Sequence, residues 1–415
     1  MNKYNGGIMR KISIFLLITC IVLIFFNCQD EFVIPEENTD HPLTISEQKI
    51  ASSSEIFGFK LFKKISSFQK DSNIFISPIS VSMALGMTLN GANGPTYDSI
   101  KTLLELNGLS EQEINQSYQS LINRLAALDP KVTFNIANSI WYLNSMNFEQ
   151  EFINTNKKYF NAEVAGLDFT NPSSVDIINN WVNQNTNGKI NKILERIPRD
   201  AVMYLINAIY FRADWKYKFD QSLTIDDSFT SVNGSSLPCK MMVQANKFNY
   251  LSNDLFQAVD LPYGDSLFSM IIILPNQDKD IDEIINQLNQ DNWNLWLGNF
   301  SVKEGKIWLP KFEIKYGFKL NDILIALGMG IAFSPGADFT RIYPPGGIWI
   351  SEVKHKTYIK VDEEGTEAAA ATSIEFVKGI NSSFQLKFNR PFIYIIRERN
   401  SNTVLFIGEM VNPGV

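Results

Sequence analysis

The stretch Val361–Ser373 reads VDEEGTEAAAATS and combines four acidic residues, a glycine and a run of small residues. Alanine and glutamate are good helix formers, so propensity alone predicts an exposed helix over Glu367–Ala371. With a period of two, the same stretch predicts a strand. One face of that strand would carry both large apolar residues, and its members are Thr366, Ala368, Ala370, Thr372, Ile374 and Phe376. The other face would carry Glu367 and Glu375. Nearly every residue from Gly365 to Ala371 is small, which suits a segment that slides between existing strands.

Composition indicates a globular protein with a large core. The chain has 415 residues, of which 45% are hydrophobic and 20% charged. A formal charge of −7 and a pI near 5.2 argue against nucleic acid or polyanion binding, because the sequence shows no basic stripe. Charge gives no hint of a polysaccharide activator. Of three cysteines, Cys20 and Cys28 belong to the N-terminal region, so Cys239 has no partner for a disulfide in a mature monomer.

Residues 1–27 have the pattern of a bacterial lipoprotein signal peptide. Three basic residues precede an apolar run that is too short and asymmetric for a membrane span and that ends at Cys28. Cleavage before Cys28 would leave a lipidated cysteine on a polar tether, residues 28–45, and would take the formal charge from −7 to −10. An uncleaved N-terminal anchor is the alternative.

The residues after that cysteine indicate a location. Gln29-Asp30-Glu31 resembles the acidic tag that sends some lipoproteins of Bacteroidota-type bacteria to the cell surface. We therefore expect a lipid-anchored protein at the bacterial outer membrane or cell surface, and otherwise a secreted one.

Hydrophobic periodicity predicts helices early in the chain and strands later. Helices are expected from about Ser46, from Ser77-Pro78 as N-cap and first turn, and over Val175–Asn185, Asp280–Leu288 and Phe318–Leu327. Strands are expected over Val132–Leu143, Ala201–Phe211, Phe268–Pro275, Lys306–Phe312 and Ile348–Val361, with a final hairpin of Ser383–Arg397 and Thr403–Val411. The long apolar run Ala201–Phe211 indicates a central strand covered on both faces. This order of elements predicts one large α+β domain.

Enzyme motifs are absent from the sequence. There is no G-x-S-x-G, H-E-x-x-H or Walker A motif, and His355 is the only histidine beyond the tether. We therefore expect no catalytic residues, no cofactor and no metal. Asn207 and His355 are polar residues within apolar strands, and by default each predicts a hydrogen-bonded core group.

Several stretches in a fixed order resemble the serpin family. They are NIFISPISVSMALGMTLNGA from Asn73, WVNQNTNGKI from Trp181, NAIYFRADW from Asn207, the stretch from Val361, FNRPFIYIIRE from Phe388 and LFIGEMVNP from Leu405. The resemblance covers Ser46 to Pro413 and implies a serpin domain over residues 46–415. The implied fold is α+β, with a large central mixed or antiparallel sheet, smaller sheets, eight or nine helices and an exposed reactive-centre loop at about residues 363–385.

The resemblance also implies roles for individual residues. Ser77, Ser80, Asn207 and His355 match the serpin shutter, a hydrogen-bonded cluster beneath the main sheet that holds two strands together and lets them part. Trp215 matches the tryptophan of the breach, where loop entry begins. The hinge at the base of the loop matches Glu363, Gly365, Thr366, Glu367, Ala368, Ala369, Ala370 and Ala371, and it keeps the inhibitory pattern of small residues.

The bait bond stays open between two candidates. Fourteen residues beyond the hinge glycine lies Gly379, which predicts cleavage of Gly379–Ile380. Counting back from Pro391 gives Ile380 instead, so the loop is about one residue longer than the commonest form. Lys378 favours the neighbouring Lys378–Gly379 bond, because an ammonium suits an acidic specificity pocket. Val377 and Phe376 are outside candidates.

The resemblance implies suicide inhibition of a serine protease, with a papain-like cysteine protease as a second class of target. The protease would be trapped covalently by loop insertion into the main sheet, and the inhibitor would be a metastable monomer. The alternative is a non-inhibitory serpin that acts as a binding or substrate-like surface protein.

Overall fold

The computed structural model describes residues 42–366 and 383–414, which contain nine α-helices and fifteen strands. The helices are α2 (Ile45–Phe68), α3 (Pro78–Leu89), α4 (Gly94–Leu103), α5 (Glu111–Ala127), α6 (Gln150–Phe160), α7 (Ser173–Asn185), α8 (Ile281–Gln287), α9 (Gln290–Gly298) and α10 (Asn321–Leu324). Shorter helical turns are η1 (Gln221–Leu223), η2 (Ile325–Met329) and η3 (Gly330–Phe333). None of the described helices is long and apolar enough to cross a membrane.

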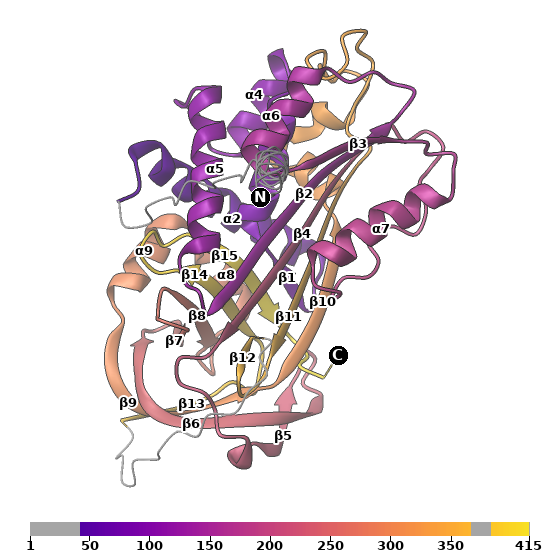
Figure 1. The fold of residues 1–415 in the computed structure, drawn as a ribbon. Helices are drawn as coiled ribbons and strands as arrows, with labels where there is room; N and C mark the ends of the chain where they lie inside the picture. The colour runs from indigo at the N-terminus through magenta and orange to yellow at the C-terminus, as the bar shows by residue number, and fades with distance from the viewer. Residues whose placement is uncertain (1–41, 367–382, 415) are drawn as a thin grey trace, which may run out of the picture. The chain divides into compact units, whose positions relative to one another are not determined.

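The strands form two sheets (Figure 1). The six-stranded sheet has the order β10 (Phe312–Lys319), β11 (Glu352–Val361), β12 (Gly365–Thr366), β4 (Met203–Asp214), β2 (Val132–Leu143) and β3 (Glu163–Leu167). The nine-stranded sheet contains β1 (Ile74–Ile76), β15 (Val404–Met410), β14 (Phe392–Glu398), β8 (Phe268–Pro275), β7 (Phe256–Tyr263), β6 (Ser236–Ser252), β9 (Ser301–Pro310), β13 (Phe384–Lys387) and β5 (Ile225–Thr230). The six-stranded sheet is mixed, because β2 and β3 pair in parallel, as do β4 and β11.

Strand β4 lies at the centre of the six-stranded sheet, as its apolar sequence predicts. Its first nine residues are all buried. One face packs into the core shared with the nine-stranded sheet through Leu205, Ile209 and Phe211. The opposite face packs against α7 through Tyr204 and Ile206, in a separate apolar cluster. A strand covered on both faces is specified by continuous apolar sequence rather than by alternation.

Helix α3 lies in the core and supports the site described below. Pro78 occupies its first turn and Ser77 precedes it as the N-cap, as predicted, although the Ser77 side chain makes no capping hydrogen bond. All twelve of its residues are buried. An α-helix with no polar face is stable only when it is enclosed on every side, which is the position of α3 within the main core.

Four predicted elements differ from the structure near prolines or turns. The expected strand Ser383–Arg397 is two strands, β13 and β14, because Pro391 has no N–H to continue a ladder. The expected strand Lys306–Phe312 is the end of β9 and the start of β10, which belong to different sheets. Strand β11 begins at Glu352 rather than Ile348, and the helix expected from Phe318 begins at Asn321.

Candidate functional site

The structural feature that defines the site is the junction between strands β4 and β11. The two strands pair directly in parallel only over Tyr204–Ile209 and Glu352–Thr357. Further along, β12 lies between them, because Thr366 pairs with both Val361 of β11 and Ala213 of β4. The chain therefore leaves β11, turns, and enters the sheet again as β12. Its two residues, Gly365 and Thr366, form a short antiparallel strand between β11 and β4 (Figure 1).

Gly365 makes the closest approach at this junction. Its φ of +155° is one that other residues rarely adopt, and a Cβ there would lie 2.2 Å from the carbonyl oxygen of Ala213 and 2.6 Å from Cα of Asp214. Both are backbone atoms of β4 and cannot move aside cheaply. Glycine is therefore required for the hinge to enter the sheet in this register.

Thr366 is held in the core by a short chain of contacts. Its hydroxyl lies 2.6 Å from the Tyr263 hydroxyl, and both residues are buried. The Tyr263 ring stacks on Trp215 with 4.4 Å between ring centroids and 9° between ring planes. The Trp215 indole Nε1 donates to the carbonyl oxygen of Asp362 at 2.9 Å. Trp215, which the sequence assigned to the breach, therefore contacts the turn from which the hinge emerges.

Two glutamates fix the turn before Gly365. Glu363 accepts hydrogen bonds from Lys311 Nζ at 2.6 Å and Thr224 Oγ1 at 2.7 Å, and Glu364 pairs with Lys218 Nζ at 2.6 Å. Burial alone would raise the pKa of Glu363, but the bonds from Lys311 and Thr224 hold that pKa below its usual value. Burial also acts against the charge of Lys218, whose pKa is nevertheless raised by its carboxylate partners. The turn is thus held as a set of ion pairs.

Asn207 and His355 lie directly opposite each other where β4 and β11 still pair. His355 Nδ1 lies 2.8 Å from Asn207 Oδ1, and His355 Nε2 accepts from the Ser77 N–H at 3.0 Å. Because Nε2 accepts, Nδ1 carries the proton and donates to Asn207. Burial lowers the pKa of His355 to about 3, so the ring is neutral at physiological pH.

The Asn207 amide completes this cluster. Its Nδ2 donates to the Ser80 carbonyl at 3.1 Å and to Asn138 Oδ1 at 2.7 Å. Ser77 and Ser80 therefore take part through backbone atoms, and neither hydroxyl has a hydrogen-bond partner among the described residues. The structure brings together the four residues that the resemblance assigned to the shutter, and it adds Asn138.

Sequence reasoning missed several residues of the site. Asn138 has a signal in the sequence, since it falls on the same face of its strand as Phe134 and Ile140 and is the polar exception there. The sequence gives no signal for Tyr263, Lys311 or Thr224, because each lies more than fifty positions from the hinge residue that it contacts. Such contacts become visible only in the folded chain.

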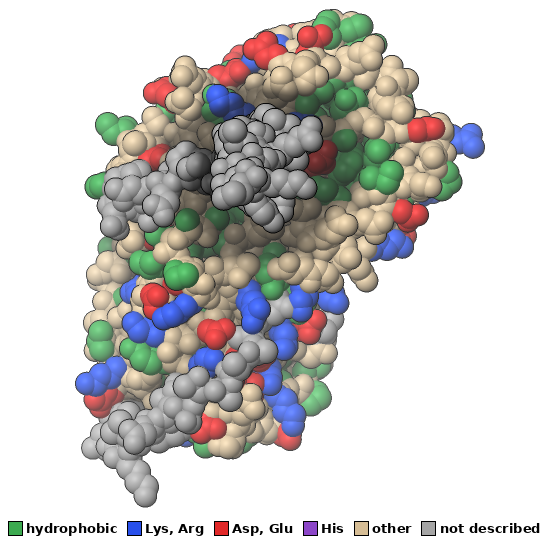
Figure 2. All heavy atoms as spheres, in the orientation of Figure 1, with side chains coloured by type: hydrophobic (Ala, Val, Ile, Leu, Met, Phe, Trp, Pro, Cys, Tyr) green, Lys and Arg blue, Asp and Glu red, His purple; other side chains and the backbone are tan. Residues whose placement is uncertain are grey.

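The pairing register also gathers lysines that are dispersed in the sequence. Lys315 on β10 and Lys354 and Lys356 on β11 surround one part of the sheet, and the pKa of Lys356 is lowered by burial first and then by Lys354, Lys315 and Lys192. Figure 2 shows Lys and Arg side chains gathered over this part of the face. The sequence shows no basic stripe, but the fold brings lysines from separate segments together on this surface.

The remaining predicted site residues lie outside the described residues. They are Glu367, Ala368, Ala369, Ala370, Ala371, Lys378, Gly379, Ile380 and Cys28. Within residues 42–366 and 383–414, no group of three or more His, Cys, Asp or Glu side chains could hold a metal ion.

Comparison with known proteins gives the family. Residues 52–413 match the family described as Serpin (serine protease inhibitor). The chain is a serpin. It is 32% identical to the leukocyte elastase inhibitor of Xenopus tropicalis over 378 residues, which are 88% of this chain and all of that protein.

Solved serpin structures have the same fold. Tengpin, a thermophilic serpin in its native state, superposes with a TM-score of 0.82 at 33% identity, over 90% of this chain and 95% of Tengpin. Human thyroxine-binding globulin gives a TM-score of 0.82 at 27% identity, over 89% of this serpin and 99% of the globulin. The predicted family and α+β serpin fold are therefore confirmed. Serpins are mostly protease inhibitors rather than catalysts, but the thyroxine-binding member means that membership alone does not make this serpin an inhibitor.

Proposed function

We propose that this serpin inhibits a serine protease as a suicide substrate, through cleavage of its loop and insertion of the loop between β4 and β11. The observation that carries the proposal is the position of β12, in which Thr366 already pairs with both strands and Gly365 pairs with β4. An insertion that has begun in the intact chain needs only to continue. The small residues that follow Thr366 offer little resistance to entry.

The observed pairing predicts the register of the inserted strand. Thr366 lies opposite Ala213 of β4 and Val361 of β11. If the loop continues antiparallel to both strands, each residue after Thr366 pairs one position further back along β4 and along β11. Thr372 would then lie opposite both Asn207 and His355. The two counts agree because β4 and β11 keep the matching parallel register between themselves. Insertion would therefore pass through the shutter and replace the direct Asn207–His355 contact.

The same register assigns the two faces of the inserted strand. Thr366 faces the core and Tyr263, so Thr372, Ile374 and Phe376 would face the core as well. The intervening residues would face outward. Near the breach that face is solvent, since Arg212 of β4 is exposed there, whereas further along it is the side that α7 covers. Ala371 and Ser373 are small enough to pass beneath that helix.

Trapping would follow from the chemistry of cleavage. The protease serine attacks the carbonyl carbon of the bait bond, the peptide C–N bond breaks, and the new amino terminus departs, leaving an acyl-enzyme ester. Fourteen inserted residues at about 3.3 Å each would carry the tethered protease roughly 46 Å. Displacement of a catalytic centre by even about 1 Å is costly, so hydrolysis of the ester would stall. Lys378–Gly379 and Gly379–Ile380 remain the candidate bait bonds.

A denaturing gel tests this proposal. The serpin is mixed with a trypsin-like and with an elastase-like protease, and a covalent complex that survives SDS is expected with at least one of them. Mass spectrometry of the released C-terminal peptide identifies the bait bond. Clean cleavage of the serpin by both proteases, with their activity retained, would contradict inhibition and support the non-inhibitory alternative.

Adjacent substitutions supply a matched control. Thr366→Arg would place a charge against Tyr263 in the core and should convert the inhibitor into a substrate. Glu367→Arg would place the same side chain opposite Arg212, on the solvent face, and should retain complex formation. Equal inhibition by both variants would contradict insertion in this register.

The cellular location belongs to the same proposal. We propose that Cys28 carries lipid and anchors the serpin, as a monomer, at the bacterial outer membrane or cell surface, where it would meet foreign proteases. The lipoprotein-like pattern of residues 1–27 supports this placement. Replacement of Cys28 by Ser should abolish metabolic labelling with a fatty acid; labelling that persists would contradict the assignment.

A further inference from the structure

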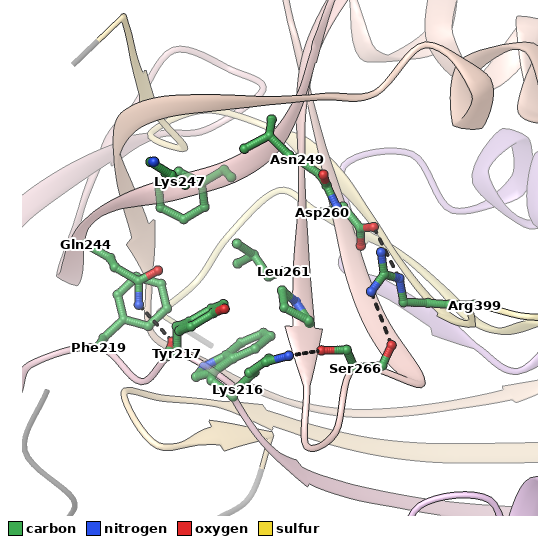
Figure 3. Close-up of a pocket in the computed structure, with 14 residues that line it drawn as sticks. Lys216, Tyr217, Phe219, Gln244, Lys247, Asn249, Asp260, Leu261, Ser266 and Arg399 are labelled. Carbon is green, nitrogen blue, oxygen red and sulfur yellow. Dashed lines mark hydrogen bonds and ion pairs between the residues drawn. The ribbon is translucent and has the colours of Figure 1, made fainter. Parts of the chain in front are cut away.

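A pocket of about 290 Å³ lies beside the breach (Figure 3). One wall is the segment after β4, with Trp215 and Phe219, and the facing wall is β6 with Phe248. These three aromatic side chains are buried. Tyr217 and Val302 also line the pocket and are 45% and 67% exposed. Its lining combines these aromatic side chains with charged and amide groups, and its size suits a small organic molecule rather than a macromolecule.

Charged groups lie beside these aromatic side chains in the same lining. Figure 3 shows Lys216 and Lys247 on opposite sides of Leu261. The Lys216 ammonium donates to the Ser266 hydroxyl, and the Lys247 ammonium forms an exposed ion pair with Glu304 at 3.7 Å. In a chain of net charge −7, two lysines in the lining of one pocket favour an anionic ligand group.

Asp260 provides a second, independent feature at the other end of the pocket. It is 4% exposed, and its Oδ2 lies 3.3 Å from Arg397 and 3.8 Å from Arg399. Its Oδ1 is buried and has no hydrogen-bond partner among the described residues. A buried acceptor without a partner is costly, so a ligand that brings an N–H or O–H donor would satisfy it.

The wall of the pocket is bonded to the hinge turn. The N–H of Trp215 donates to the carbonyl of Glu364 at 2.9 Å, and the N–H of Phe219 donates to the carbonyl of Glu363 at 2.9 Å. Trp215 also holds the carbonyl of Asp362 through its indole. A molecule packed against the side chains of Trp215 and Phe219 would restrain the segment that fixes these three carbonyls.

We propose that this pocket binds a small organic anion with an aromatic body and a hydrogen-bond donor, and that its occupancy holds the hinge turn in place. The anionic group pairs with Lys216 or Lys247, the aromatic body contacts Trp215 and Phe219, and the donor reaches Asp260. Binding in the pocket does not depend on the proposed inhibitory function. Its consequence for inhibition does, because a restrained turn slows loop entry only if the loop inserts.

Binding is tested with 8-anilinonaphthalene-1-sulfonate, which has a sulfonate, an aromatic body and an N–H donor. Fluorescence titration of the intact serpin should saturate at one equivalent. The double variant Lys216→Glu, Lys247→Glu should bind at least about 10-fold more weakly, whereas Lys303→Glu, an exposed lysine on β9 outside the pocket, should bind within about 2-fold of the parent. Equal affinity in all three proteins would overturn the site.

A second substitution guards against misfolding of the charge variant. Val302 is exposed at the pocket edge, so Val302→Trp should fold normally and reduce binding by obstruction, whereas Val232→Trp, at an exposed position elsewhere, should not. Melting curves show whether each variant is folded. Retention of full affinity by a folded Val302→Trp protein would also overturn the site.

The link to the hinge is measured without any protease. Amide hydrogen exchange in residues 362–366, none of which lines the pocket, should slow at least about 3-fold at saturating probe. Unchanged exchange with a filled pocket would overturn the coupling. Because neither measurement uses protease inhibition, failure of the proposed function leaves both results interpretable.

Discussion

At the scale of single residues, Gly365 is the position with the least freedom. Replacement by Ala would bring Cβ to 2.2 Å from the Ala213 carbonyl and would require a strained backbone. We expect Gly365→Ala to displace β12 from β4, to break the bond between Thr366 and Tyr263, and to accelerate amide exchange over residues 362–366 by at least about 10-fold. Exchange measured by mass spectrometry checks this expectation.

The control for this substitution is another glycine with free space. Gly298 ends α9, and a Cβ there would meet no atom within 4 Å. Gly298→Ala should leave hinge exchange unchanged and should stabilise the protein slightly, because alanine favours helix. If amide exchange over residues 362–366 were similar in the two alanine variants, the close approach of Gly365 to β4 would not be needed to hold β12 in the sheet.

His355 makes stability depend on pH through the shutter. Its pKa is about 3 in the folded chain and about 6.5 when unfolded, so the unfolded chain binds the extra proton between these values. The stability that the neutral ring contributes is complete above pH 6.5 and decreases as pH falls, by at most about 1.4 kcal/mol per pH unit. Protonation would also remove the acceptor that Nε2 offers to the Ser77 N–H.

Two buried carboxyl groups change the stability with pH in the opposite direction to His355. The effect of His355 must therefore be measured as the difference between the parent and a variant that lacks the histidine. Burial raises the pKa of Glu55 to about 8 and that of Glu409 to about 7, and the stability they contribute decreases as pH rises above 4.5. Melting temperatures of the parent and of His355→Asn should therefore be compared between pH 4.5 and 7.5. The parent should melt at a higher temperature than His355→Asn at pH 7.5, and this difference in melting temperature should become smaller as pH falls. A difference that stays constant would contradict the lowered pKa of His355.

At the scale of secondary-structure elements, the sequence predicts the strands whose pattern is local. The apolar run of β4 and the alternation of β2 identify both strands, and the order of helices before strands predicts the α+β fold class. The long strand β6 was missed, although Asn233-Gly234 just before it is a hairpin signal and Gly234 has a φ of +80°. Strand order and the entry of β12 between β4 and β11 depend on contacts between distant segments, which no local pattern contains.

The register of β12 allows a prediction for the inserted element. Thr372 should come to lie between Asn207 and His355, so Thr372→Arg should stop insertion about halfway, because an arginine cannot be buried among these neutral groups. After loop cleavage, the melting temperature of this variant should lie between those of the intact and the cleaved parent. A Thr372→Arg protein that reaches the full stability of the cleaved parent would contradict the register.

At the scale of the whole molecule, the site has features of a fold held short of full pairing. Among the described residues, the junction of the central sheet holds Gly365 and Thr366 as the two-residue strand β12. The hydroxyls of Ser77 and Ser80 are buried without partners in the described part of the chain. Where β4 and β11 pair, the Asn207–His355 contact adds a polar interaction to the backbone ladder and to the apolar pair Leu205 and Val353. Polar contacts of this kind can be exchanged for those of an incoming strand.

Such a fold should gain stability when the loop is cut. Burial of Ile374 and Phe376 alone would contribute roughly 5 kcal/mol, and each kcal/mol raises the melting temperature of a large domain by about 2 °C. We therefore expect cleavage near Lys378 to raise the melting temperature by at least about 10 °C, measured by calorimetry on the intact and cleaved proteins. The Thr366→Arg protein, cut at the same bond, serves as the control, because its cleaved loop should stay outside the sheet and leave its melting temperature unchanged. An intact and a cleaved parent that melt together would mean that no free energy is stored in the native sheet, and inhibition by insertion would then have no driving force.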